Sequence, residues 1–391
     1  MKINLNVQGL CYETIRGIAT YEINLLKALT QRNRFRYEIT FFDYKKERGN
    51  LAYVNKHFDE KTLSKLDILE CNSVNFKDIK NGCSVNDFSK FAYATYKEII
   101  GSSSDVFHIP DSSVIPLNAS KNLVVTVHDI MPVIYKGVGY WDKETERAFN
   151  NSHRFIAEHK NIQIIAVSRQ TKHDLIEYYG IDGDRIDVVP EACDISVFYE
   201  ENNTNVLRNL GINQPYLLYL GALDARKGII DIWRAYERIA RKYPEVKMVM
   251  AGRPYMNFQK YIDKYRKERE GVIYTGYVDE VQKRVLLSMA EAFVFPSEYE
   301  GFGLPVLEAM ACGTPVIASN SSSLPEVGGD AVLYVKPNNN EELEEKMDMI
   351  LSDSNLRKSY KDKGFKQCKK FSWDKTAELT EQVYQRAIDM N

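Results

Sequence analysis

The chain has 391 residues, which is enough for two ordinary domains and more than a single hydrophobic core usually supports. It carries 52 Lys and Arg residues against 54 Asp and Glu residues, and the formal net charge of −2 argues against a general nucleic-acid binder, which needs a clear basic excess. A hydrophobic fraction of 44% and a charged fraction of 27% are typical of a soluble globular enzyme.

The N-terminal stretch MKINLNVQGLCYET has one lysine and no apolar run, so we expect no signal peptide. No window of the sequence reaches the length of a membrane-spanning helix. The six cysteines are scattered and form no Cys-x-x-Cys pair, so we expect neither a zinc site nor a disulfide framework. This cysteine usage fits a reducing cytosol, and we predict a cytoplasmic protein.

In the first half of the chain, short apolar runs alternate with helical patterns, which predicts a parallel α/β architecture. A helix is predicted over residues 18–30, because apolar residues such as Tyr21, Leu25 and Leu29 fall at helical spacing. Residues 50–104 are polar, and we interpret them as a variable insertion. The predicted strands are residues 3–7, 37–42, 106–109, 123–127, 162–167 and 186–189.

A polar stretch over residues 200–213, which contains ENNTN, is predicted to be a linker. The alternation then restarts, and from residue 338 onward the pattern is helical with a break at residues 371–373. We therefore predict two doubly wound domains, over residues 1–199 and 214–371, with ligands beyond the carboxyl ends of their strands. A helical segment over residues 372–391 ends the chain. The predicted strands of the second domain are residues 216–220, 247–251, 272–274, 292–295, 315–318 and 332–335.

The stretch PSEYEGFGLPVLEAMACGTP, residues 296–315, carries the strongest indication of chemistry. Gly301 and Gly303 precede a short predicted helix. The N–H groups at such a helix start bind anions, and glycine lets a phosphate approach closely. Glu308 is predicted to lie in the first turn, where its carboxylate can accept hydrogen bonds from two ribose hydroxyls. Glu300 lies on the preceding loop, where it can face a sugar. The simpler interpretations are a surface residue for Glu300 and a partner of the helix dipole for Glu308.

Two further groups of residues are candidates for a site. Arg226 and Lys227 follow a predicted strand end, where two cations can neutralise the charge that grows on a diphosphate leaving group. The simpler interpretation of this pair is a solvated basic surface. His128 ends the predicted strand LVVTV, and the simpler interpretation is a core or capping histidine. His108, at the end of DVFHI, is the second histidine candidate.

Together these motifs resemble the retaining GT-B glycosyltransferases, specifically glycosyltransferase family four. The spacing of Glu300 and Glu308 matches the family's Glu-x7-Glu signature, and YLGALDARKGI matches its donor-diphosphate motif. VMAGRP, TGYV, and GTPVIAS followed by SSLPEV match in the same order, and VVTVHDI places His128 at the family's histidine position. The resemblance covers nearly the whole chain and is stronger in the second domain. In VVPEACD, Glu191 and Ala192 replace the usual Asn-Gly, and we infer nothing catalytic from this departure.

The resemblance implies a GT-B fold, in which two Rossmann-like domains face a central cleft, the first binding the acceptor and the second the nucleotide sugar. It implies catalytic roles for His128, Glu300, Arg226 and Lys227, with His128 near the reacting face of the transferred sugar. It also implies that the segment 372–391 packs back on the first domain, although an ordinary last helix of the second domain fits the pattern too. Besides the two cations, the residues assigned to donor binding are Gly17 with Arg16 beside it, Val278, Gly301, Phe302, Gly303, Leu304 and Glu308.

We expect no metal ion and no cofactor, since the nucleoside-diphosphate sugar is itself the donor substrate. Asp182-Gly183-Asp184 resembles the Asp-x-Asp metal motif of other glycosyltransferases, but it lies in a predicted turn where Asp-Gly is ordinary. The cations Arg226 and Lys227 can supply the positive charge instead. The three-glycine dinucleotide fingerprint is absent from the sequence, which argues against an oxidoreductase.

The sequence therefore predicts a hexosyltransferase that moves a hexose-type sugar, with retention of configuration, to a glycan or lipid-linked acceptor. By analogy with the family, the setting is bacterial surface polysaccharide synthesis. A lipid-linked acceptor would bring the enzyme to the inner face of the plasma membrane as a peripheral protein. Two alternatives stay open: a glycoside hydrolase or phosphorylase that uses Glu300 and Glu308 as a carboxylate pair, and a non-catalytic nucleotide-sugar-binding protein on the same fold.

Overall fold

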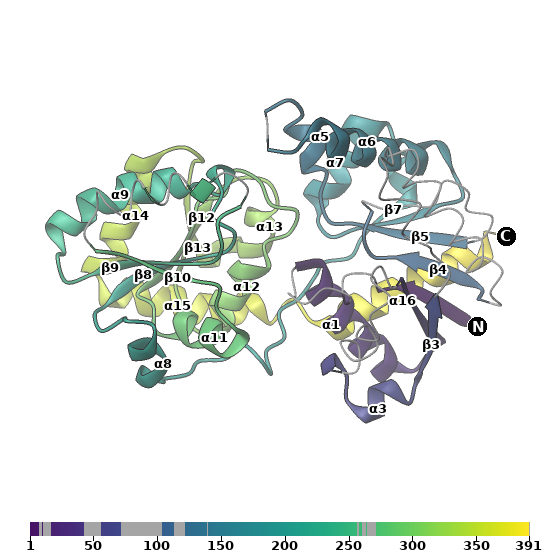
Figure 1. Ribbon diagram of the computed structural model, residues 1–391, viewed down its shortest axis with the longest axis horizontal. Helices are drawn as coiled ribbons and strands as arrows, with labels where there is room; N and C mark the ends of the chain where they lie inside the picture. Colours follow the sequence, from purple (N-terminus) through teal and green to yellow (C-terminus); the bar gives the residue numbers. More distant parts are fainter. Residues whose placement is uncertain are drawn as a thin grey trace. The chain divides into compact units, whose positions relative to one another are not determined.

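The computed structural model describes residues 1–7, 10, 17–42, 56–71, 104–112, 122–138, 140–255, 258–259, 263 and 271–390. The chain forms two compact units, each with its own parallel sheet (Figure 1). Unit 1 comprises Met1–Glu191 and Trp373–Asn391, and unit 2 comprises Ala192–Ser372. Arg16 and much of the stretch 50–104 lie outside the described residues.

The sheet of unit 1 has seven parallel strands in the order β3-β2-β1-β4-β5-β6-β7. The order reverses between β1 and β4, and in such sheets ligands bind beyond the carboxyl ends of the strands at this switch point. The helices and strands of unit 1 in the segment before Glu191 are β1 (Lys2–Asn6), α1 (Gly17–Arg32), β2 (Arg36–Phe42), α3 (Glu60–Leu63), β3 (Leu66–Cys71), β4 (Val106–Ile109), β5 (Asn122–Val127), α5 (Met131–Ile134), α6 (Lys143–Glu158), β6 (Gln163–Ala166), α7 (Arg169–Tyr179) and β7 (Ile186–Val188).

Helices cover both faces of this sheet, so its central strands are buried on both sides. Along β5, Val124 belongs to the apolar cluster of α1, whereas Leu123 and Val125 belong to the cluster on the other face, which includes Phe155 of α6. This alternation follows the period of two of a strand. The helix predicted over residues 18–30 is α1, and most of its apolar side chains are buried.

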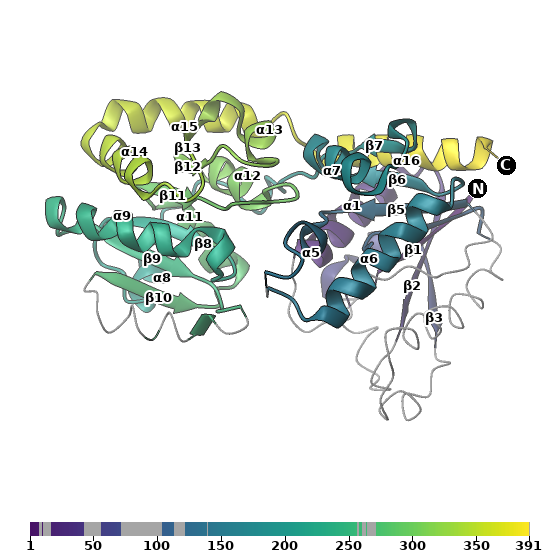
Figure 2. The same ribbon diagram turned by 90° about the horizontal axis from the view of Figure 1, so that it is seen from above.

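The last helix of the chain, α16 (Trp373–Asp389), belongs to unit 1 and lies beside α1 (Figure 2). Glu381 of α16 is fully buried, and it accepts hydrogen bonds from Arg32 Nε at 3.0 Å and from the Tyr37 hydroxyl at 3.1 Å. A buried carboxylate with two donors fixes the register of the helix on the sheet. The side chains of α16 that enter the core of unit 1 are Ala377, Val383, Tyr384 and Ala387.

The sheet of unit 2 has six parallel strands in the order β10-β9-β8-β11-β12-β13, so its switch point lies between β8 and β11. The helix α9 packs with α14, and α12 packs with α15. Across the described residues of both units, no helix is long and apolar enough to cross a membrane. The elements of unit 2 are α8 (Thr204–Asn209), β8 (Tyr216–Leu220), α9 (Ile229–Lys242), β9 (Lys247–Ala251), β10 (Val272–Gly276), α11 (Glu280–Ser288), β11 (Ala292–Phe295), α12 (Leu304–Ala311), β12 (Val316–Ser319), α13 (Leu324–Gly328), β13 (Val332–Val335), α14 (Asn340–Ser352) and α15 (Ser354–Cys368).

The predicted α/β fold class is confirmed, and each predicted strand corresponds to a strand of the structure with ends that shift by at most two residues. The strand β3 was not predicted, because it lies in the stretch 50–104 that we interpreted as an insertion. It is the edge strand of unit 1 and pairs with β2.

The division between the units falls after Glu191, whereas the sequence indicated residue 199. Residues 192–199 belong to unit 2, where Phe198 packs under the Lys283 ammonium of α11 at 4.9 Å from the ring centre. The stretch 200–213, predicted to be a linker, contains α8, and its Glu201 pairs with Arg284 at 2.6 Å. These contacts make the stretch part of unit 2.

Candidate active site

The loops after β8 and β11, the strands at the switch point of unit 2, bring Lys227 and Glu300 together. The Lys227 ammonium forms an ion pair with Glu300 Oε1, and the two side chains are only 13% and 12% exposed. The ammonium also lies 5.6 Å from the centre of the Phe295 ring at the end of β11. Two predicted catalytic residues that are 73 positions apart in the sequence therefore meet at the carboxyl edge of the sheet.

These two loops pack directly against each other. Gly228, which caps α9, has a φ of +71°, and a Cβ at this position would lie 2.5 Å from the Pro296 carbonyl oxygen. A side chain there would push the two loops apart. The Glu298 N–H donates to the Arg226 carbonyl at 2.9 Å. The contact of the loops thus fixes the spacing between the charged side chains that they carry.

Arg226 is held in a different way from its neighbour Lys227. Its side chain is 9% exposed, and its Nε lies 3.0 Å from Asp224 Oδ2. Asp224 also accepts the Arg226 N–H at 3.4 Å, which caps the short helical turn that carries both cations. The sequence suggested two cations and did not distinguish them, whereas the structure shows Arg226 fixed by its own turn and Lys227 paired with the neighbouring loop.

The loop that carries Glu300 is supported by serines in the segment 320–323, directly after β12. The Ser323 hydroxyl donates to the carbonyls of Glu300 at 2.9 Å and Phe302 at 2.6 Å. Ser322 Oγ accepts the Glu300 N–H at 2.8 Å. Sequence reasoning matched this segment to a family motif but gave the serines no role. A run of serines directly after a predicted strand is the signal that could have identified them.

The helix α12 begins directly after Gly303, which has a φ of +114°. A Cβ on Gly303 would lie 2.8 Å from a methyl of Leu324, so both the backbone conformation and the space require glycine. The Phe302 ring is buried and packs edge-on against Phe371 at 5.8 Å. Phe302 therefore turns its ring into unit 2, and its backbone forms the loop.

Glu308 lies in the second turn of α12 and not in the first turn as predicted, because the helix begins at Leu304. Its carboxylate is 6% exposed and pairs with the Lys283 ammonium of α11 at 2.5 Å. A specific cationic partner removes the basis for the simpler interpretation, in which Glu308 only complements the helix dipole. Lys283 was missed from the sequence, because a lysine on a helix usually indicates a solvated face.

In unit 1, His128 follows β5 and has a partner at each ring nitrogen. Its Nδ1 lies 2.8 Å from Glu191 Oε1, and its Nε2 lies 2.8 Å from the Pro110 carbonyl oxygen. The Tyr21 ring packs edge-on against the imidazole, with ring centres 4.9 Å apart. Burial alone would lower the pKa of His128, but the hydrogen bond and charge of Glu191, the charge of Asp111 and the Pro110 carbonyl outweigh it and raise the pKa.

His108, the second histidine candidate, lies in the core of unit 1. Its Nδ1 is 2.7 Å from the Tyr384 hydroxyl of α16, and its Nε2 is 2.8 Å from Thr126 Oγ1. Burial, with a smaller effect of the charge on His128, lowers the pKa of His108 to about 3. His108 is therefore a neutral side chain that joins α16 to the sheet, and the structure does not place it at an accessible edge.

The other predicted binding residues lie on loops or at helix starts. Gly17 begins α1 and is exposed, and a Cβ there would meet open space. Val278 follows β10 and is half-buried, and so is Leu304 at the start of α12, whereas Gly301 is buried in the loop after β11. The structure thus places Val278, Leu304 and Gly301 beyond the carboxyl ends of strands in unit 2.

Asp182 caps a short turn before β7, where its Oδ1 accepts the Asp184 N–H at 3.0 Å. This is the ordinary turn chemistry expected for Asp-Gly. In the part of the chain that the structure describes, no three His, Cys, Asp or Glu side chains are grouped so that they could hold a metal ion.

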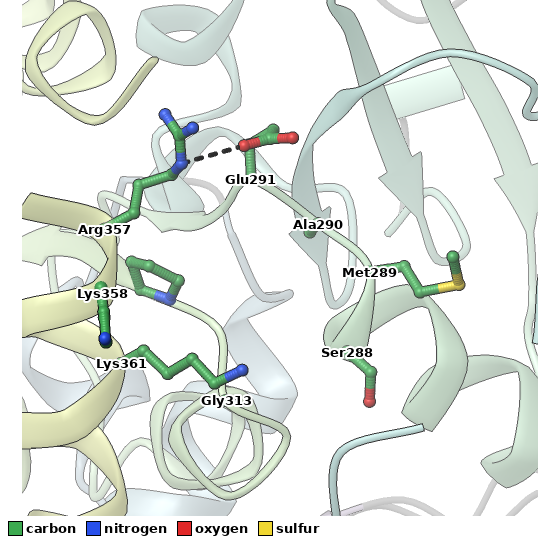
Figure 3. A pocket seen from close by; sticks show the side chains of 9 residues that line it. Ser288, Met289, Ala290, Glu291, Gly313, Arg357, Lys358 and Lys361 are labelled. Carbon is green, nitrogen blue, oxygen red and sulfur yellow. Dashed lines mark ion pairs between the residues drawn. The ribbon is translucent and has the colours of Figure 1, made fainter. Parts of the chain in front are cut away.

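A hollow of about 200 Å³ opens between α15 and the segments that lead into β11 and β12 (Figure 3). It lies at the amino edge of the sheet, away from the predicted site. Two of its cations have partners, because Arg357 pairs with Glu291 at 3.2 Å and Lys361 pairs with Glu200 at 2.6 Å. The hollow contains none of the predicted site residues.

Two family models match the chain. The model described as Glycosyltransferase Family 4 matches residues 15–197, and the model described as Glycosyl transferases group 1 matches residues 204–367. The first match falls largely in unit 1 and the second falls within unit 2.

Similar proteins include mannosyltransferases and a structure with bound UDP. The chain is 34% identical over 272 residues to the O-antigen chain mannosyltransferase B of Escherichia coli, which covers 67% of this chain and 69% of that protein. It is 28% identical over 284 residues to the serotype-specific mannosyltransferase WbdA of Escherichia coli, which covers 69% of this chain but only 34% of that protein. The crystal structure of Anabaena HepE in complex with UDP and glucose has a TM-score of 0.74 at 16% identity and covers 98% of this chain and 99% of that chain.

Proposed function

Because the chain belongs to glycosyltransferase family four, the group 1 glycosyl transferases, we propose that it moves a hexose from a nucleoside-diphosphate sugar to a glycan or lipid-linked acceptor with retention of configuration. The Lys227–Glu300 pair at the switch point of unit 2 carries this proposal. The two mannosyltransferase relatives support mannose as the first donor sugar to test.

Lys227 and Arg226 supply the positive charge that a departing nucleoside diphosphate needs. The Lys227 ammonium pairs with Glu300, and a diphosphate oxygen can compete for it, because lysine forms charge-assisted hydrogen bonds with phosphate as it does with carboxylate. Arg226, fixed by Asp224, adds a second positive charge at a set position. The N–H groups of the Gly301–Gly303 loop and of the start of α12 add a favourable electrostatic environment for the phosphates.

The two carboxylates of the signature serve different parts of the donor in this proposal. Glu300, once a phosphate occupies Lys227, can accept hydrogen bonds from sugar hydroxyls. Glu308 accepts hydrogen bonds from the ribose hydroxyls, while its ion pair with Lys283 orients the carboxylate. The base lies near Val278, beyond the carboxyl end of β10. In unit 1, the family resemblance supports contacts from His128 and Gly17 to the transferred sugar.

The proposed reaction is a front-face substitution. The bond from the anomeric carbon to the diphosphate oxygen breaks while the acceptor oxygen attacks the same face of the sugar. The acceptor proton passes to the departing phosphate oxygen, so the step needs no protein base. Catalysis then depends on stabilising the charge that grows on the leaving group, which the two cations can do without a metal ion.

Separate partners for the two carboxylates support transfer over hydrolysis. A glycoside hydrolase needs two carboxyl groups on either side of one bond. Here Glu300 pairs with Lys227 after β8, whereas Glu308 pairs with Lys283 of α11. We propose that the protein works in the cytoplasm, and a lipid-linked acceptor would bring it to the inner face of the plasma membrane.

A two-stage experiment tests the proposed function. Thermal shift across nucleoside diphosphates first identifies the base, since a bound ligand raises the melting temperature. Incubation with the matching nucleotide sugars and glycan or lipid-linked acceptors should then release nucleoside diphosphate in step with a glycosylated product, whose anomeric configuration NMR reads. Release of free sugar without a glycosylated product would support the hydrolase alternative. Binding without turnover across the panel would support the non-catalytic alternative.

A further inference from the structure

His128 is linked by contacts to residues beside both points where the chain crosses from one unit to the other. Glu191, which contacts its Nδ1, is the last residue of unit 1 before the first crossing. Trp373, the first residue of unit 1 after the second crossing, packs on the Tyr21 ring with centres 5.9 Å apart. Tyr21 in turn packs on His128. Residues beside both crossings are therefore linked to His128, Glu191 directly and Trp373 through the Tyr21 ring.

The segment around Glu191 is anchored to α16. The Thr376 hydroxyl, in the first turn of α16, donates to the Pro190 carbonyl at 2.7 Å. Glu191 is 5% exposed, and its side chain is directed at His128. The backbone on which Glu191 sits is thus fixed independently of the contact with His128.

The partners of His128 decide its protonation state by geometry. Glu191 Oε1 and the Pro110 carbonyl oxygen can only accept hydrogen bonds, and each lies 2.8 Å from a ring nitrogen. A neutral imidazole has one N–H and can satisfy one of them, whereas a doubly protonated ring satisfies both. The carboxylate holds Nδ1–H more strongly than a carbonyl holds Nε2–H, because the bond is between opposite charges. The Nε2–H is therefore the donor that a substrate hydroxyl can share.

We propose that Glu191 is a positioning residue that holds His128 as an imidazolium, so that His128 acts on the sugar as a fixed cation and N–H donor and never as the base for the acceptor. The proposal rests on the proposed sugar transfer. It assigns a role to the residue that stands where the family commonly has Asn-Gly. It also leaves the departing phosphate as the group that takes the acceptor proton.

The charged and titratable groups that face His128 come from the elements packed against it. They are Glu191 after β7, Asp111 after β4, His108 on β4 and Tyr21 of α1. Burial raises the pKa of Tyr21 and lowers the pKa of His108, so both are neutral near pH 7. The two carboxylates favour the imidazolium, and of these Glu191 makes the direct contact.

The decisive variant is Glu191→Gln, which keeps the size of the side chain and removes its charge. NMR of histidine-labelled full-length protein should show the pKa of His128 falling by about one unit or more. The alkaline limb of kcat should move to lower pH by the same amount, because activity is lost when His128 deprotonates. Affinity for the nucleoside diphosphate should not change, since Glu191 lies in unit 1. Glu191→Asp, which keeps the charge, should restore most of the wild-type pH profile.

The matched control is Glu177→Gln, which removes the carboxylate partner of the exposed His173, 3.3 Å away in the same unit. It should leave the titration of His128 and the pH profile of kcat unchanged. An unchanged pKa of His128 in Glu191→Gln would overturn the proposal, and so would a kcat that rises as His128 deprotonates. If Glu191→Gln does not fold, Glu191→Asp decides by itself. Its shorter side chain keeps the charge but lengthens the contact, so the pKa of His128 must fall by a smaller, measurable amount, and an unchanged pKa would overturn the proposal.

The two proposals can fail separately. If the wild-type enzyme transfers no sugar with any donor, the proposed function fails, and the NMR titration still decides whether Glu191 controls His128. If transfer occurs but the titration of His128 does not depend on Glu191, only the inference about Glu191 fails.

Discussion

In unit 2 the carboxyl edge of the sheet carries two lysine–carboxylate pairs, whereas in unit 1 the same edge carries one enclosed histidine. The sheets have the same strand order around the switch point, so the difference comes from the residues of the loops and helices that follow the strands. All six histidines of the chain belong to unit 1 and none to unit 2. The common strand order fixes where a site can lie, and the residues that follow the strands decide its chemistry.

The two edges also differ in how readily they can respond to a ligand. A lysine pairs with a carboxylate or a phosphate through a flexible stem, so Lys227 and Lys283 can exchange partners. His128 is enclosed by Glu191, the Pro110 carbonyl and the Tyr21 ring. We interpret unit 2 as the half in which lysines can leave their carboxylate partners to pair with a ligand. We interpret unit 1 as the half that presents the charge of His128 at a fixed position.

The strongest test of this comparison is Lys227→Ala. Removing the cation that meets the leaving group in the proposed reaction should lower kcat by roughly 10²- to 10³-fold, the cost of losing one positioned group that stabilises transition-state charge. Initial rates at saturating donor measure this loss. Lys242→Ala is the control, because it removes another lysine–carboxylate pair of unit 2 that is 59% exposed at the lysine. Equal rates for the wild type and Lys227→Ala would break the assignment of the leaving group to unit 2.

A second test separates the two carboxylates within unit 2. Glu308→Ala should weaken binding of the free nucleoside diphosphate by roughly 1.5–3 kcal/mol, because a charged hydrogen-bonded contact is lost. Glu300→Ala should chiefly lower kcat, because we propose that its carboxylate contacts the sugar, which the free nucleotide lacks. Isothermal calorimetry gives the first effect and steady-state rates give the second. Unchanged nucleotide affinity in Glu308→Ala would remove its ribose role.

Acid should destabilise unit 1 before unit 2. Burial lowers the pKa of His108 to about 3 and that of His153 to about 4, below the value of about 6.5 in an unfolded chain. Their contribution to stability is complete above about pH 6.5 and is lost as the pH falls below it, because the unfolded chain binds more protons. The raised pKa of His128 contributes stability that is complete only below about pH 6.5, so it offsets a small part of this loss between pH 7 and about pH 6.5 and none below that pH.

At pH 5, His108 and His153 should each lower the free energy of unfolding by on the order of 1 kcal/mol relative to pH 7. Hydrogen exchange read by mass spectrometry reports each unit through its own peptides. Protection should fall in unit 1 and change less in unit 2, which has no histidine. The exposed His173→Gln should not alter the result. Earlier loss of protection in unit 2 would contradict the comparison.

The sequence predicted most of the fold, because strands buried on both faces read as apolar runs between helical patterns. It missed β3, an edge strand in which Asp67 and Glu70 interrupt the apolar residues. It also set the domain boundary too late, because the polar composition of residues 200–213 resembles a linker. The contact of Glu201 with Arg284, which makes that stretch part of unit 2, is a long-range feature with no local pattern.

At the candidate site, the sequence predicted roles for several charged residues but did not predict their partners. The meeting of Lys227 and Glu300 depends on two loops of different strands, which only the topology brings together. The sequence pattern of α11 did not indicate that Lys283 pairs with Glu308. Glu191 appeared only as a departure from a familiar turn, although it contacts His128. Local sequence patterns do not reveal which residues, far apart in the chain, contact each other in the fold.

The smallest expected effect is that of a metal chelator, which should leave the rate of transfer unchanged. If Arg226 and Lys227 neutralise the leaving group, a divalent ion adds nothing to that step. Asp182, the best metal candidate in the sequence of unit 1, accepts the Asp184 N–H in a turn and so already has a structural role. Initial rates in excess EDTA, compared with rates in added magnesium or manganese, measure the effect. Asp182→Asn, which preserves the acceptor oxygen of the cap, should likewise keep the full rate. A rate that EDTA abolishes and manganese restores would contradict the prediction, and the leaving-group charge would then depend on more than the cations of unit 2.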